Sequence, residues 1–126
     1  MDWMTIRLEL AATEGFAQGS ASRAFLLRLP LDQHGHIDAD ALARNPTRAS
    51  MSRFWASEPD EYGEIEHADG IWIFRSQSRK NGEAVFRLES PLFQLGGQVT
   101  IEDPEGQKLP FRVTSVRGLG AKAARP

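Results

Sequence analysis

LGGQVTIEDPEGQKLPFRVTSV, residues 95–116, is the stretch of this sequence that decides the fold. Apolar and polar residues alternate on both sides of Asp103-Pro104-Glu105-Gly106, and a period of two is typical of strands with one buried face. In the central tetrapeptide, Asp can accept hydrogen bonds from nearby backbone, Pro presets φ, and Gly suits the last position of a turn. The stretch therefore predicts two antiparallel strands joined by a tight turn.

The rest of the chain carries similar signals. Asp69-Gly70 and Asn81-Gly82 each predict a two-residue hairpin turn, because a type I′ turn needs positive φ at both positions. The acidic residues around Pro59 predict a loop over residues 57–63. Alternation predicts further strands over residues 4–10, 25–31, 48–55 and 84–89. Residues 64–68 and 71–76, on either side of Asp69-Gly70, are also expected to be strands.

One helix of about two turns is expected between residues 32 and 46. Asp38 is a suitable N-cap, since its carboxylate can accept from free backbone N–H groups. Ile37 and Leu42 have the spacing of a hydrophobic staple, and Asn45-Pro46 ends the helix.

Successive strands joined by short turns predict an antiparallel meander. We therefore predict a mostly β fold: a small antiparallel barrel of seven or eight strands with one short helix. A two-sheet β-sandwich is the alternative, and the barrel is favoured because closure removes the edge strands. Residues 1–117 would form a single domain, and the small, basic residues 118–126 are expected to be a disordered tail.

The composition narrows the function classes. The chain has 126 residues, a net charge of −2 and no cysteine, which excludes disulfides and thiolate chemistry. It contains no apolar run long enough for a signal peptide or a membrane span, so a cytoplasmic protein without a membrane partner is expected. The net charge gives no global attraction to nucleic acid, and such binding is not expected without a local basic stripe.

Two clusters of titratable residues could carry chemistry. His34 and His36, close to Asp32, resemble ligands for a divalent cation, but a left-handed turn at Gly35 leading into the helix cap explains the same residues. We therefore expect no metal and no cofactor. Glu66 and His67 belong to the densest acidic stretch and could act as a general acid–base pair.

Arginine stands beside aromatic residues in two segments, Arg53-Phe54-Trp55 and Trp72-Ile73-Phe74-Arg75. Such a set could stack on bases or bind a carboxylate or phosphate, whereas the alternative is that the aromatic residues are core. Residues 71–76 are apolar on both parities, so one apolar set must be covered by the helix, a loop or another molecule. We therefore predict a partly exposed patch, and its candidate ligand-binding residues are Arg53, Trp55, Trp72 and Arg75.

Two stretches, RFWASEPDEYG (53–63) continuing through the strands to IWIFRS (71–76), and FRLESPLFQLGGQVTIEDPEGQKLPFRVTSV (86–116), resemble a family of small bacterial proteins of unknown function. The resemblance covers about the second two-thirds of the chain. Its motifs are turns and strand starts, so it implies no activity and no site residues.

Two functional hypotheses follow. The first is a non-enzymatic binding or interaction module that uses an arginine and aromatic face, or an oligomer interface such as that of a homodimer, towards an unidentified ligand or protein. The second is a small enzyme with a carboxylate–histidine site around Glu66 and His67. The sequence has no P-loop, GxGxxG, GxSxG or HExxH motif that would favour an enzyme class.

Overall fold

The computed structural model describes residues 2–77, 84–89 and 91–118 of the chain. Its elements in chain order are β1 (Asp2–Leu10), β2 (Ser20–Leu31), α1 (Ala39–Arg44), η1 (Pro46–Arg48), β3 (Ser50–Trp55), β4 (Glu61–Ala68), β5 (Ile71–Ser76), β6 (Ala84–Glu89), β7 (Gln98–Glu102) and β8 (Lys108–Gly118). Two predictions concern residues outside these ranges: the turn at Asn81-Gly82 and the tail beyond Gly118.

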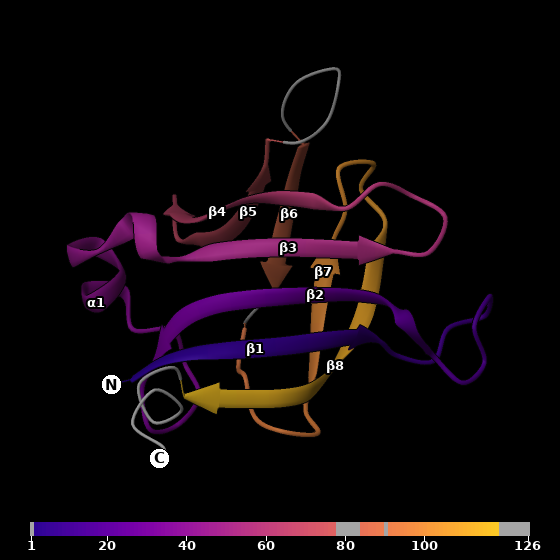
Figure 1. Cartoon of the computed structure of the whole chain (residues 1–126), viewed down its shortest axis with the longest axis horizontal. Helices are drawn as coiled ribbons and strands as arrows, with labels where there is room; N and C mark the ends of the chain where they lie inside the picture. The colour runs from indigo at the N-terminus through magenta and orange to yellow at the C-terminus, as the bar shows by residue number, and fades with distance from the viewer. Residues whose placement is uncertain (1, 78–83, 90, 119–126) are drawn as a thin grey trace, which may run out of the picture.

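The eight strands form one closed antiparallel barrel in which each strand pairs with its neighbours in sequence, and β8 pairs back with β1 (Figure 1). The predicted barrel is confirmed, and the sandwich is not adopted. Several boundaries differ from the expectation. β1 and β2 begin earlier than predicted, at Asp2 and Ser20, and β3 begins later, at Ser50. β4 begins at Glu61, inside the expected loop, and β8 continues to Gly118, which pairs with Met4. No helix within the described ranges is long and apolar enough to cross a membrane.

The barrel interior is filled by side chains. Phe25 lies at its centre, with ring centroids of Phe74, Phe86 and Phe111 between 5.2 and 5.5 Å away. These four rings are at most 1% exposed, and each sits at an inward position of its strand. Aromatic rings at such distances in tilted or edge-on arrangements attract one another beyond simple burial. The interior is therefore a packed core, and binding sites have to be sought on the rim or the outer wall.

Two loops share the sequence pattern Asp-x-x-Gly-x and the same hydrogen bonds. Asp103 Oδ1 accepts from the backbone N–H groups of Glu105 and Gln107 at 3.0 and 2.8 Å. Asp32 Oδ1 accepts likewise from His34 and His36 at 2.8 and 3.0 Å. These two backbone donors hold the pKa of Asp32 below its ordinary value.

The turn-and-cap interpretation of residues 32–38 is confirmed. Gly35 has a φ of 91°, and Asp38 Oδ1 accepts from the N–H of Ala41 at 3.0 Å at the start of α1. Leu42 of α1 is buried. The guanidinium of Arg48, in η1, stands 4.7 Å over the ring of Trp3. This segment therefore covers one end of the outer wall, because Trp3 has the outward parity of β1 and is still only 6% exposed.

The hairpin between β4 and β5 has the predicted turn. Asp69 and Gly70 are the two residues between the strands, and their φ angles are 53° and 76°. Positive φ at both positions is what a type I′ turn requires.

We expect Gly70→Val to lower the free energy of unfolding by about 1–3 kcal/mol, because a β-branched residue is strained at positive φ. A Cβ at Gly70 would meet no atom within 4 Å, so the loss of stability would come from backbone strain and not from a steric clash. The measurement is the urea midpoint. Gly15→Val is the matched control, since that position is equally open and its φ is not positive. Equal midpoints for the two variants would contradict the turn assignment.

Candidate functional site

The structure divides the four predicted ligand-binding residues among three places. Arg53 and Trp55 lie together at the end of the barrel where β3 turns into β4. Trp72 lies at the opposite end, beside the turn between β4 and β5. Arg75 lies on the outer wall, bonded to Glu66. A single surface made of these four residues is therefore not formed.

Arg53 points into the barrel and belongs to a buried ion-pair network. Its Nη1 donates to Glu61 Oε2 at 2.7 Å and to Glu58 Oε1 at 3.1 Å. Ser76 Oγ donates to the other oxygen of Glu61 at 2.8 Å, and the guanidinium stacks 4.2 Å from the ring of Trp55. Arg53, Glu61 and Ser76 are each at most 8% exposed. The network connects β3, β4 and β5, and Arg53 compensates the buried charge of Glu61.

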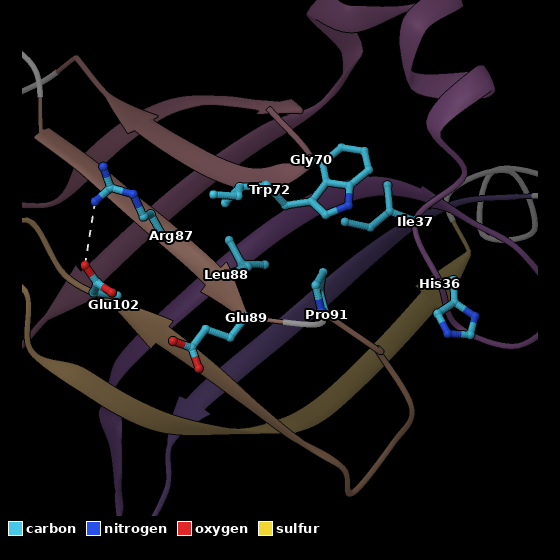
Figure 2. A pocket seen from close by; sticks show the side chains of 10 residues that line it. His36, Ile37, Gly70, Trp72, Arg87, Leu88, Glu89, Pro91 and Glu102 are labelled. Carbon is cyan, nitrogen blue, oxygen red and sulfur yellow. Dashed lines mark ion pairs between the residues drawn. The ribbon is translucent and has the colours of Figure 1, made fainter. Parts of the chain in front are cut away.

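Trp72 borders an open groove of about 760 Å³ at the α1 end of the barrel (Figure 2). The imidazole of His67 stacks on the indole with centroids 4.1 Å apart and planes 8° apart. Ile37, Leu88 and Pro91 supply other apolar parts of the lining (Figure 2). The groove thus offers an aromatic and aliphatic surface, and the indole in it is stacked against His67.

The charged residues at the groove are engaged with other charged residues. Arg87 Nη1 lies 3.6 Å from Glu102 Oε2, as the dashed line in Figure 2 marks. Lys108 Nζ lies 2.7 Å from Glu89 Oε2, and this hydrogen bond raises the pKa of the lysine. A charged ligand would therefore have to compete with existing ion pairs.

Glu66 and His67 do not converge. Glu66 faces outward, where Arg75 Nε donates to its Oε2 at 2.8 Å, while His67 has the opposite parity and stacks on Trp72.

Ile73 lies between Glu66 and Arg87 in the sheet, and it faces outward yet is only 8% exposed. We attribute its burial to the aliphatic stems of these long side chains, which can cover apolar surface. Among the described residues, no three His, Asp or Glu side chains are grouped as metal ligands.

Sequence reasoning missed a cluster of arginines on the outer wall. Thr5 on β1 pairs with Arg28 on β2 and with Arg117 on β8, so the two arginines flank the threonine on one face. Arg7, two residues after Thr5 on β1, also faces outward. Arg112 on β8 pairs with the outward-facing Glu9 and therefore lies on the same face. We call the surface formed by Arg7, Arg28, Arg112 and Arg117 the arginine face.

The arginine face contains little negative charge. Glu9 is the one carboxylate at the outward positions of β1, β2 and β8, strands that the structure describes in full, and Arg7 Nε binds it at 2.8 Å. Arg28, Arg112 and Arg117 are exposed and have no hydrogen bond or ion pair to any described side chain. The alternation in each strand signalled that these residues face outward, but only the closure of β8 onto β1 brings them together.

Aromatic residues border the arginine face on its β3–β4 side. A cross-strand row runs from Arg7 to Leu26, Ser52 and Tyr62. Tyr62 is 54% exposed, and Phe54 lies on the same face, two residues beyond Ser52 on β3. The outer wall of β8, β1, β2, β3 and β4 therefore presents arginines on one side and two aromatic rings on the other.

Comparison of the chain with protein-family models, with curated proteins and with solved structures found no match.

Proposed function

We propose that this protein is a non-enzymatic binding module and that its arginine face binds an extended polyanion. The observation that carries the proposal is that Arg28 on β2 and Arg112 and Arg117 on β8, the two strands that flank β1, are exposed without a described carboxylate partner. The guanidinium group donates in a planar fork that matches the oxygens of phosphate, sulfate or carboxylate groups.

The clustering of the arginines does not stabilise the fold. Arg28 and Arg117 are two strand spacings apart, about 10 Å, and like charges at such positions repel each other. The whole chain has a net charge of −2, so the rest of the molecule, outside the arginine face, carries a negative net charge. A bound polyanion would relieve the repulsion, and a local field of this kind steers an anionic partner to one face.

The enzyme hypothesis has weaker support. Its two residues, Glu66 and His67, face opposite sides of β4 and are engaged with Arg75 and Trp72 respectively. General acid–base catalysis needs both groups within hydrogen-bond reach of one substrate.

The proposal is tested with heparin, a sulfated polysaccharide, as the probe. We expect the wild type to be retained on immobilised heparin at low salt, and Arg28→Gln/Arg117→Gln to elute at clearly lower salt. The control, Arg75→Gln/Lys108→Gln, removes the same net charge from residues that are ion-paired to Glu66 and Glu89. It should elute close to the wild type.

Two results would contradict the proposal. Wild-type protein that passes through the column at low salt has no polyanion-binding surface. Equal shifts for the two double variants would show that only the net charge matters.

A further inference from the structure

We infer that the polyanion is a single-stranded nucleic acid, with its phosphates on the arginine face and its bases on Tyr62 and Phe54. This inference rests on the proposed function and adds the class of ligand. Arginine alone does not distinguish one polyanion from another, because phosphate and sulfate groups accept the same hydrogen bonds. The aromatic side of the surface is what makes the distinction.

The aromatic rings lie within reach of a chain bound to the arginines. From Arg7 on β1 to Tyr62 on β4 the row crosses three strand spacings, about 14 Å. Sites for single strands on barrel folds cover about four nucleotides or more, so one bound strand is long enough to cross this width. Phe54 and Tyr62 are diagonal neighbours across β3 and β4, so both rings lie in the same part of the outer wall.

Besides the distance between the arginines and the rings, the exposure of Tyr62 favours a nucleic acid. Tyr62 is 54% exposed, whereas most large apolar side chains of the barrel are buried. Sites for single strands combine a positive surface that follows the backbone with aromatic rings on which bases stack, and they need no sequence preference. The polar residues between the two sides, Ser50 and Ser52, leave the path from arginine to tyrosine open to a polar backbone.

A duplex and a lipid surface fit this wall less well. Reading a duplex requires an element that enters a groove, usually a helix or a two-stranded ribbon, and this face is the smooth outer wall of a barrel. An anionic membrane would attract the arginines, but stable attachment needs apolar side chains that insert, and Tyr62 stands to one side of the positive charge.

The test compares probes that share a charge but differ in bases: an oligothymidylate of about twelve nucleotides, an abasic strand of equal length, and inorganic polyphosphate. Binding is followed by fluorescence anisotropy across a salt series. We expect the oligothymidylate to bind about tenfold more tightly than the abasic strand, which corresponds to stacking of one base.

The variants separate the two sides of the surface. Tyr62→Ala should lower the preference for oligothymidylate, and Phe54→Ala/Tyr62→Ala should remove it, with binding of the abasic strand unchanged in both. Tyr62→Phe, which keeps the ring, should retain the preference. Arg28→Gln/Arg117→Gln should weaken binding of all three probes and lower the salt slope by about two, one for each lost phosphate contact. Urea midpoints of the variants verify that each is folded.

Each other outcome contradicts a defined part of the argument. Equal binding of all three probes, unaffected by Tyr62→Ala, overturns the inference and leaves the proposed function standing. Binding to vesicles with anionic lipid but not to any oligonucleotide also overturns it, in favour of a membrane surface. If none of the probes binds and the protein is not retained on heparin, the proposed function itself is wrong.

Discussion

Replacing Arg53 with methionine is expected to lower the free energy of unfolding by about 3 kcal/mol, although methionine fills much of the same volume. Arg53 is 8% exposed and its Nη1 lies 2.7 Å from Glu61, which is itself 6% exposed. Without the guanidinium, the buried carboxylate of Glu61 loses its ion pair with β3. Removing one partner of a buried pair is costly because the other charge stays in a medium of low polarity.

Arg75→Met is the matched control. Arg75 also binds a glutamate on a neighbouring strand, at 2.8 Å, but both side chains of that pair are partly exposed to water. Exposed ion pairs contribute little, so this variant should lose less than about 1 kcal/mol. Urea-induced unfolding followed by circular dichroism gives both values.

A double variant tests the cause. In Arg53→Met/Glu61→Leu the carboxylate that lost its arginine is gone as well. We expect more than half of the lost stability to return, with Ser76 Oγ then lacking this acceptor. If the double variant is less stable than Arg53→Met by the full cost of a second independent substitution, the two residues are not coupled.

The same residue illustrates what the sequence could and could not predict. Period-two alternation and turn residues were sufficient for the strands and the Asp69-Gly70 turn, because these signals are local. Closure was expected only from the general argument that a barrel has no edge strands. Arg53 shares the inward parity of Ala49, Met51 and Trp55, and it therefore weakened the strand pattern. Its partner Glu61 lay in a segment that was expected to be a loop. A buried charge becomes interpretable only when its cross-strand neighbour is known.

The arginine face shows the same limit at longer range. Alternation within β1, β2 and β8 correctly indicates that Arg7, Arg28 and Arg112 face outward, since each has buried residues on both sides. Nothing in the local pattern indicates that the last strand pairs with the first. The overall net charge concealed the cluster, because it averages this face with the acidic side chains elsewhere.

Gly63 is the residue whose importance the sequence concealed most, since it closed the expected loop and carries no side chain. In the structure it lies within β4 and pairs with Met51 on β3 and Ser76 on β5. A Cβ at this position would collide with the carbonyl oxygen of Arg75, and would lie 2.7 Å from its carbonyl carbon and 2.9 Å from the Cα of Ser76. Glycine within a strand often marks such a close approach of two backbones.

Gly63→Ala is therefore expected to lower the free energy of unfolding by at least about 3 kcal/mol, the upper range for overpacking, because the atoms in the way are backbone and cannot rotate aside. β4 would have to move away from β5, which would disturb the neighbouring bond between Ser76 and Glu61. The Gln77 amide, which donates to the Tyr62 carbonyl at 3.1 Å, should then lose its protection from hydrogen exchange. Gly15→Ala, at an open position, should change neither quantity. An unchanged urea midpoint and a protected Gln77 amide in Gly63→Ala would show that β4 and β5 are not packed this closely.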